Sequence, residues 1–253
     1  MSLVLTGLTK TYGGLHVVDT VGFSVADGAM VGLIGPNGAG KSTLFSLVTG
    51  FLAADAGEVS YAGRAFGTAS PMQRARAGMV RSFQVPREFT HLTVRDNLIA
   101  AAPDQIGEGL IGAFFRPAAV RAQEAALIAR ADETIAFLRL GKVADVPAGK
   151  LSGGQKKLVE LGRALMTGAR MILLDEPFAG VNPVLIAELS DRIRDLNARG
   201  LGFLIIEHDL GALTRLVNTL HVMDRGRLIA SGTPDAVLAD PQVRDAYLGG
   251  AAA

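Results

Sequence analysis

Residues 35–42 match the phosphate-binding pattern G-x-x-x-x-G-K-[ST] in full. Glycines let the backbone curl, so that successive N–H groups point at phosphate oxygens. Lys41 would reach the terminal phosphates, and the Ser42 hydroxyl would hold Mg²⁺. The residues expected to contact a nucleoside triphosphate are Gly35, Pro36, Asn37, Gly38, Ala39, Gly40, Lys41, Ser42 and Thr43.

The segments on either side of this loop favour the same interpretation. The apolar run Met30 to Ile34 predicts a buried strand, and Ser42 to Val48 predicts a helix whose positive dipole end faces the phosphates. The alternatives are a glycine-rich turn that happens to precede a lysine and a dinucleotide-binding loop. The pattern G-x-G-x-x-G of the latter would need glycine at position 43, where the chain has Thr43.

Two carboxylates follow the apolar run Met171 to Leu174 directly. Ligands of open α/β sheets bind at the carboxyl ends of strands. Because side chains alternate across a strand, Asp175 and Glu176 are expected to face different ways. We expect Asp175 to hold the Mg²⁺ water shell and Glu176 to orient and deprotonate an attacking water. The alternative is a pair of solvated charges that open a loop.

A second anion-binding helix start is predicted at Leu151-Ser152-Gly153-Gly154-Gln155. The helix that follows has apolar positions on one face, at Leu158, Leu161 and Leu165. Ser152 is a suitable N-cap, and the two glycines leave backbone N–H groups open to a close anion. The alternative is a flexible turn.

The elements that must position these residues predict an α/β fold. Strand patterns at the N-terminus indicate an antiparallel layer, and two short apolar runs with a helical pattern between them indicate a parallel sheet. The expected antiparallel strands are Leu3 to Tyr12, Val17 to Val25 and Gly57 to Arg64; the expected parallel strands are Met171 to Leu174 and Phe203 to Ile206, with the helix at Val184 to Asn197. The fold class is a phosphate-loop NTPase core with an antiparallel β subdomain and a helical subdomain.

We expect one domain over residues 1–253, with the core and β layer in 1–87 and 168–253. Residues 88–167 are expected to form the helical subdomain, because Ala118 to Leu140 is alanine-rich and shows helical spacing without a strand signal. Strands are expected again at Leu220 to Met223 and Arg227 to Ala230. A helix should follow Thr233, a good N-cap before proline, and the chain should end in a loose tail from Gly249.

Composition narrows the class of protein. A chain of 253 residues that is 49% hydrophobic can bury a full core, and a net charge of +1 gives no reason to expect nucleic acid. There is no cysteine, and the four histidines are scattered, which leaves phosphate-bound Mg²⁺ as the metal implied. Residues 1–14 show no signal peptide, and no apolar stretch reaches about 18 residues, so we expect a cytoplasmic protein.

The segment Leu151 to Gln155 resembles the signature sequence of ABC (ATP-binding cassette) ATPases, which other phosphate-loop families lack. The resemblance spans almost the whole chain. It implies that Tyr12 stacks on adenine and that Gln84 touches Mg²⁺ and the lytic water and senses a membrane partner. It also implies that His208 contacts the γ-phosphate. Taken singly, these residues could be a surface aromatic, a polar loop residue and a histidine satisfied at a strand end.

The resemblance further implies that two such subunits pack head to tail, with ATP between the phosphate loop of one and the signature of the other. Neither half-site completes the chemistry alone. ATP would favour the closed pair, and hydrolysis would release it.

Further residues are similar to one branch of this family, the larger ATPase subunit of branched-chain (hydrophobic) amino-acid and amide importers. The cues are Asn182 in place of the usual aspartate, the phrase Phe83 to Phe89 with Leu92 to Val94, the insertion Pro103 to Asp132 and the ending Ala246 to Gly249. This likeness implies a motor at the cytoplasmic face of the membrane under two permease subunits, fed by an external solute-binding protein. It implies a second, related ATPase, and so a heterodimer rather than a homodimer. In the insertion, Phe114-Phe115 are expected either at the permease or in the subdomain core.

Two other classes of protein remain open from the sequence. One is an ABC ATPase without a permease, acting in iron–sulfur assembly or on nucleic acid, several of which carry a long coiled coil or a second cassette; the chain has neither. The other is a phosphate-loop kinase or GTPase, in which Leu151 to Gln155 would be coincidence. Guanine selectivity or a phosphorylated product would favour the second class.

Overall fold

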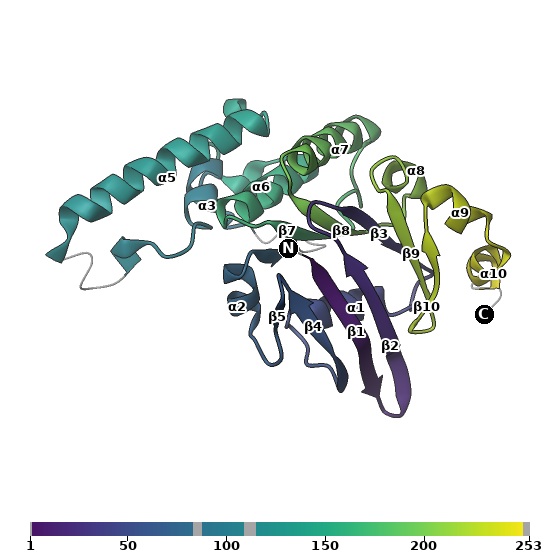
Figure 1. The fold of residues 1–253 in the computed structure, drawn as a ribbon. Coiled ribbons are helices and arrows are strands. Elements are labelled where there is room, and N and C mark those ends of the chain that lie inside the picture. The colour runs from purple at the N-terminus through teal and green to yellow at the C-terminus, as the bar shows by residue number, and fades with distance from the viewer. Residues whose placement is uncertain (1, 83–87, 109–114, 250–253) are drawn as a thin grey trace. The chain divides into compact units, whose positions relative to one another are not determined.

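A computed structural model describes residues 2–82, 88–108 and 115–249 (Figure 1). Its chain forms two compact units. The first consists of Met1–Gln84, Arg170–Ala179 and Ile193–Ala253, and the second of Val85–Ala169 and Gly180–Arg192. Among the described residues, no helix has the length and apolar character needed to cross a membrane.

The first unit contains a four-stranded antiparallel sheet, which confirms the expected N-terminal layer. Its strands are β1 (Leu3–Tyr12), β2 (Leu15–Val25), β4 (Ala56–Tyr61) and β5 (Arg64–Ala65), in the order β2-β1-β4-β5. The single strand expected at Gly57 to Arg64 is divided in two. Ala62 and Gly63 have positive φ values of 54° and 76°, so the chain turns back between β4 and β5.

The same unit contains a six-stranded sheet in the order β10-β9-β3-β8-β7-β6. Its strands are β3 (Met30–Ile34), β6 (Met79–Arg81), β7 (Met171–Asp175), β8 (Gly202–Ile206), β9 (Thr219–Asp224) and β10 (Arg227–Gly232). All neighbours are parallel except β9 and β10, which form the expected C-terminal hairpin. The strand β6 carries too few residues to show a pattern, and the sequence analysis named no strand there.

Helix α1 (Lys41–Val48) leaves the phosphate loop and packs into a core shared with both sheets. Its Leu44, Phe45 and Val48 are fully buried. Alternate residues of the parallel strands, such as Leu33 and Leu173, join the same cluster, as the two-residue period of a strand requires. Burial of each such side chain contributes about 1.5–3 kcal/mol, so α1 is held firmly beneath the loop.

Arg74 supports the other end of α1. This residue lies in α2 (Pro71–Arg76) and is 5% exposed. Its Nη1 donates to the carbonyl oxygens of Leu47, at 2.9 Å, and Val48, at 2.6 Å. Because the last carbonyls of a helix have no partner within it and carry its negative dipole end, the guanidinium stabilises α1 there.

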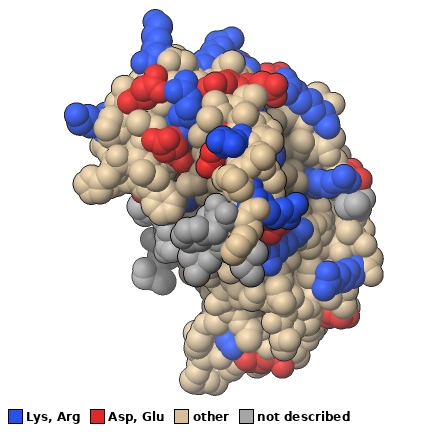
Figure 2. All heavy atoms as spheres, turned by 90° about the vertical axis from the view of Figure 1, so that its left-hand side faces the viewer, with Lys and Arg blue, Asp and Glu red and all other residues tan. Residues whose placement is uncertain are grey.

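The second unit is helical in its described residues. It holds α3 (Val94–Ile99), α5 (Pro117–Phe137), α6 (Gly153–Met166), the start of α7 (Pro183–Ala198) and the 3₁₀ turns Ile106–Glu108, Gly141–Val143 and Ala148–Lys150. Gly162 of α6 lets α3 and α5 approach, since a Cβ there would lie 2.7 Å from Leu98 Cδ2 and 2.9 Å from Leu138 Cδ1. On the face that Figure 2 shows, Lys and Arg side chains occur together with Asp and Glu side chains.

Three expectations from the sequence need correction. Thr233 precedes α9 (Pro234–Ala239), but its side chain makes no cap hydrogen bond. Phe115 is 79% exposed, so it does not enter the subdomain core. The tail was expected to begin at Gly249, but this residue ends α10 (Pro241–Gly249). The rest of the expected tail, 250–253, lies outside the described residues, as do Phe114 and the segment 83–87, which includes Gln84. The chain closes with α8 (Leu210–Leu213), α9 and α10.

Candidate nucleotide site

The phosphate loop depends on glycine at two points of close approach. Gly35 has φ 150° and Gly40 has φ 97°, in the region that side chains rarely adopt. A Cβ at Gly35 would lie 2.0 Å from the Met223 carbonyl oxygen, and one at Gly40 would lie 2.3 Å from that of Val17. The loop backbone therefore lies directly against β9 and β2, with no room for a side chain at either glycine.

The N-terminus of α1 is open to an anion. Gly40 is the N-cap, no side chain of the described residues caps the helix, and its first turn holds no acidic residue. Its first N–H groups have no acceptor within the helix and carry the positive end of the dipole. A phosphate group fits such a place without further support.

Lys41 lies beneath the loop and is 6% exposed. Its Nζ donates to the carbonyl oxygens of Gly35, at 2.7 Å, and Pro36, at 2.9 Å. Burial lowers the pKa of this ammonium, and the nearby carboxylates of Glu176 and Asp175 oppose the change. The ammonium is thus shielded from water and hydrogen-bonded to the same loop that would receive the phosphates.

Asp175 ends β7 and is 3% exposed. Arg81, at the end of the neighbouring strand β6, donates from Nη2 to Asp175 Oδ2 at 2.6 Å. The Ser82 hydroxyl accepts the Asp175 N–H at 3.4 Å. A buried carboxylate needs such a counter-charge. The sequence alone indicates no role for Arg81, whose only signal is a basic residue directly after the apolar pair Met79-Val80.

Glu176 and His208 meet at the ends of β7 and β8. Glu176 Oε1 lies 2.9 Å from His208 Nε2, and their side chains are 16% and 46% exposed. The two carboxylates have different partners, Arg81 for Asp175 and His208 for Glu176, and strand alternation alone does not explain this. Glu176 has φ 50°, a left-handed conformation that costs on the order of 1–3 kcal/mol, so it has already left the strand.

Glu207 lies between β8 and His208 and is 3% exposed. Its carboxylate accepts backbone N–H groups from Phe178 at 2.6 Å, His208 at 3.0 Å and Asp209 at 3.4 Å. Burial raises the pKa of this carboxyl group, and the three N–H bonds oppose the rise. Sequence analysis did not single out Glu207, although a carboxylate that ends an apolar strand was the signal used for Asp175.

Two tyrosines of the first unit bear on the candidate site, one from β1 and one from α10. Tyr12 ends β1 and is 51% exposed, with Lys10 Nζ 5.6 Å from its ring centroid, so one aromatic face is available for stacking. Burial raises the pKa of the Tyr247 phenol in α10, and the nearby backbone of Gly35 opposes the rise. Tyr247, within the ending Ala246 to Gly249, therefore lies close to the start of the phosphate loop.

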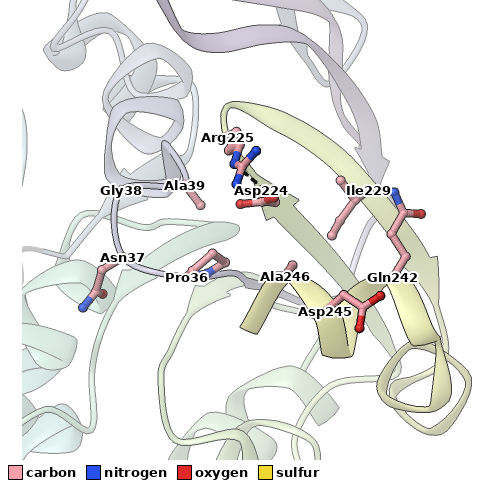
Figure 3. A pocket seen from close by; sticks show the side chains of 10 residues that line it. All are labelled: Pro36, Asn37, Gly38, Ala39, Asp224, Arg225, Ile229, Gln242, Asp245 and Ala246. Carbon is pink, nitrogen blue, oxygen red and sulfur yellow. Dashed lines mark ion pairs between the residues drawn. The ribbon is translucent and has the colours of Figure 1, made fainter. Parts of the chain in front are cut away.

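A cavity of about 500 Å³ adjoins the phosphate loop on the side of α10 (Figure 3). Figure 3 shows Pro36 to Ala39 at the left, the turn Asp224-Arg225 at the top, and Gln242, Asp245 and Ala246 of α10 from the right to the lower centre. Its lining carries two carboxylates and one guanidinium. An open cavity thus lies between the phosphate loop and α10.

The second unit holds the other predicted helix start. Ser152 caps α6 in a capping box: its hydroxyl accepts the Gln155 N–H at 3.3 Å, and Gln155 Oε1 accepts the Ser152 N–H at 3.0 Å. A Cβ at Gly153 would meet nothing within 4 Å, whereas one at Gly154 would lie 1.4 Å from Leu185 Cδ2. Gly153 therefore leaves room for a ligand, and Gly154 leaves room for α7.

Asn182 precedes α7 in this second unit. Its Oδ1 accepts the Leu185 N–H at 3.0 Å, as an N-cap does. Asparagine serves this role as well as aspartate, so the missing charge does not weaken the start of α7.

Comparison with known proteins matches this chain to one family. Residues 18–179 match the family model described as ABC transporter. The chain belongs to the ABC transporter family. Residues 227–253 of this ABC ATPase match a second family model, described as branched-chain amino acid ATP-binding cassette transporter.

Relatives along the full length agree with this assignment. The chain is 39% identical to the probable branched-chain amino acid transport ATP-binding protein LivG of Methanocaldococcus jannaschii, over 96% of this chain and 95% of that protein. It is 36% identical to the lipopolysaccharide export system ATP-binding protein LptB of Acidithiobacillus ferridurans, over 96% and 94%. A crystal structure of the ADP conformation of an ATP-binding cassette of an ABC transporter is 38% identical, with a TM-score of 0.83, over 98% and 99%.

These comparisons confirm the resemblance, the fold class and the assignment as an ATP-hydrolysing, transport-coupled ABC subunit of the branched-chain amino acid type. They also confirm a nucleotide as ligand. In the first unit, the phosphate loop, Asp175, Glu176 and His208 lie at the carboxyl ends of neighbouring parallel strands. The segment Ser152 to Gln155 belongs to the second unit, and Gln84 lies outside the described residues.

Proposed function

We propose that this ABC ATPase binds ATP with Mg²⁺ and hydrolyses it as the motor of an importer for branched-chain amino acids or related amides. The observation that carries the chemistry is the pair Glu176 and His208, 2.9 Å apart at the strand ends beside the loop. The observations that support the transported class are the match of residues 227–253 and the names of the relatives.

The first unit supplies the phosphate-binding groups. Residues 35–43 would surround the phosphates with N–H groups, Lys41 would transfer its Nζ from the loop carbonyls to phosphate oxygens, and Tyr12 would stack on the base. Each N–H bond to a charged phosphate contributes about 1.5–3 kcal/mol net. The loop therefore dominates affinity over a single stacked ring, which contributes about 1–3 kcal/mol in total.

The oxygen ligands for Mg²⁺ fit the donor set that this ion prefers. Ser42 is the second residue of α1 and Asp175 ends β7, and Gln84 is a further proposed ligand. When bound, the ion neutralises charge on the phosphates. Arg81 now holds the Asp175 carboxylate at 2.6 Å, so this ion pair must open or be shared for the carboxylate to serve the metal's water shell.

Glu176 is the proposed general base. Its carboxylate is oriented by His208, and the left-handed backbone at Glu176 turns it out of the strand. Glu176 would accept a proton from the attacking water, while His208 would contact the γ-phosphate through its half-exposed ring.

We further propose that both units form a single ABC ATPase domain over residues 1–253. Ser152, Gly153, Gly154 and Gln155 of one chain would face ATP bound by a second, related ATPase subunit. The support is the uncapped α1 and the open space at Gly153. Two permease subunits would hold this pair at the cytoplasmic face of the membrane, and an external solute-binding protein would deliver the solute.

The test is affinity purification of Glu176→Gln from membranes in the presence of ATP, with the wild-type chain as control. We expect the variant to bind ATP without releasing phosphate, and to retain permeases and a second ATPase. Normal phosphate release would remove Glu176 from its role. Recovery of lipopolysaccharide-export components, which the relative LptB makes a second candidate, or of a partner with no membrane span in the absence of any permease, would overturn the importer assignment.

A further inference from the structure

One buried carboxylate joins the two loops that carry the proposed catalytic pair. Glu207 Oε1 accepts the Phe178 N–H at 2.6 Å, and Oε2 accepts the N–H groups of His208 at 3.0 Å and Asp209 at 3.4 Å. Phe178 lies in the segment after β7, whereas His208 and Asp209 lie in the segment after β8. Each carboxylate oxygen therefore serves a different loop.

The positions of these bonds matter for Glu176 and His208. The Ala179 N–H donates to the Glu176 carbonyl oxygen at 3.2 Å, which closes a turn around the Phe178 N–H that Glu207 holds. His208 is held at its own N–H. The Glu176 N–H also donates to the Ile206 carbonyl oxygen at 2.9 Å, so the backbone itself joins the ends of the two strands. A change at Glu207 would release the two segments beyond that bond, which carry the residues on either side of the 2.9 Å contact between Glu176 and His208.

The bridge requires a carboxylate of this length. An ionised carboxylate is acceptor-only on both oxygens, which suits donors on both sides. Glutamine would place an NH₂ group against an N–H on one side, and aspartate is one methylene too short to reach both loops. Alanine would leave buried N–H groups without an acceptor, at a cost of about 1–3 kcal/mol each.

We infer that Glu207 is a positioning residue, which sets the separation and orientation of the Glu176–His208 pair by fixing both loops to one carboxylate. The inference rests on the proposed function only where ATPase activity is used to test it. The loop geometry can be measured separately.

The first experiment observes His208 directly in nucleotide-free protein. The chain has four histidines, so the imidazole NMR resonances are few, and His208→Ala assigns the signal. We expect Glu207→Gln and Glu207→Asp to shift the His208 resonances and to leave His221 in place. If neither variant moves the His208 signal, the inference is wrong.

The matched control is Asn197→Ala. Asn197 also bridges two segments of the first unit: its Nδ2 donates to the carbonyl oxygens of Gly28 at 2.7 Å and Leu201 at 2.8 Å, ahead of β3 and β8. Its removal loosens the chain ahead of β8, at the opposite end of that strand from Glu207, and the chain ahead of β3. We expect this variant to lose stability with an unchanged His208 spectrum. A His208 shift in Asn197→Ala equal to that in Glu207→Gln would reduce Glu207 to a general structural role.

The second experiment separates binding from turnover. We expect Glu207→Gln to keep ATP affinity within about threefold and to lower kcat about 100-fold, since a displacement of about 1 Å has this effect. In a His208→Ala background, Glu207→Gln should have a much smaller further effect, because residues that act as a unit are not additive. Equal losses in both backgrounds would overturn the inference. Full activity of His208→Ala would instead refute the proposed role of His208, and the NMR result would still decide for Glu207.

Discussion

Substitution of Gly154 by alanine tests why the signature segment carries two glycines. In α6, a Cβ at Gly154 would lie 1.4 Å from Leu185 Cδ2 and 2.7 Å from Leu185 Cγ. Both residues belong to the second unit, and Leu185 stands in the first turn of α7. The Gly154→Ala methyl group therefore forces Leu185 to move.

Two opposing terms determine the size of the effect. Forcing a methyl group into a filled space costs typically about 1–3 kcal/mol, and the half-buried Leu185 can yield, which favours the lower end. Alanine in place of glycine in a helix stabilises by up to about 1 kcal/mol. In the wild-type background we expect a net destabilisation of about 0–2 kcal/mol. In a Leu185→Ala background, where the methyl group has room, Gly154→Ala should become stabilising.

The assay is chemical unfolding of the four proteins of this double-mutant cycle, with a coupling free energy of about 1–3 kcal/mol expected between the two sites. Gly153→Ala is the matched control, because a Cβ there meets nothing within 4 Å, and it should show no coupling to Leu185. If Gly154→Ala has the same effect in both backgrounds, the packing explanation for this glycine is refuted.

Three further results are expected. Arg81→Gln should lower the free energy of unfolding by about 3 kcal/mol without metal, since it removes the guanidinium that pairs directly with the buried Asp175; an unfolding curve identical to wild type would contradict that pairing. Burial lowers the pKa of His221 from 6.5 to about 4. The free energy of unfolding should therefore be constant above pH 6.5 and fall by about 3 kcal/mol as the pH drops toward 4, because the unfolded chain binds the proton first. In acid titrations followed by circular dichroism, His221→Phe should show a weaker pH dependence. Tyr12→Ala should weaken ATP binding whereas Lys41→Ala should nearly abolish it, and equal losses in a nucleotide titration would contradict this ranking.

Local patterns in the sequence determined much of the site. The glycines of residues 35–42 signal a loop of unusual backbone conformation, and a carboxylate at the end of a buried strand is visible without a structure. Both signals arise from neighbours in the chain, because the phosphate loop lies between one strand and one helix. The same holds for the Ser152 capping box, whose partners are three residues apart.

Tertiary structure decided which distant residues control these groups. Arg81 and Asp175 are 94 positions apart, and Glu207 and Phe178 are 29 apart. Their contacts depend on the order β3-β8-β7-β6, which makes neighbours of strands that are distant in sequence. No period or motif within one segment encodes that order. The sequence therefore determined which residues could bind and react, and the strand order decided which charges hold them in place.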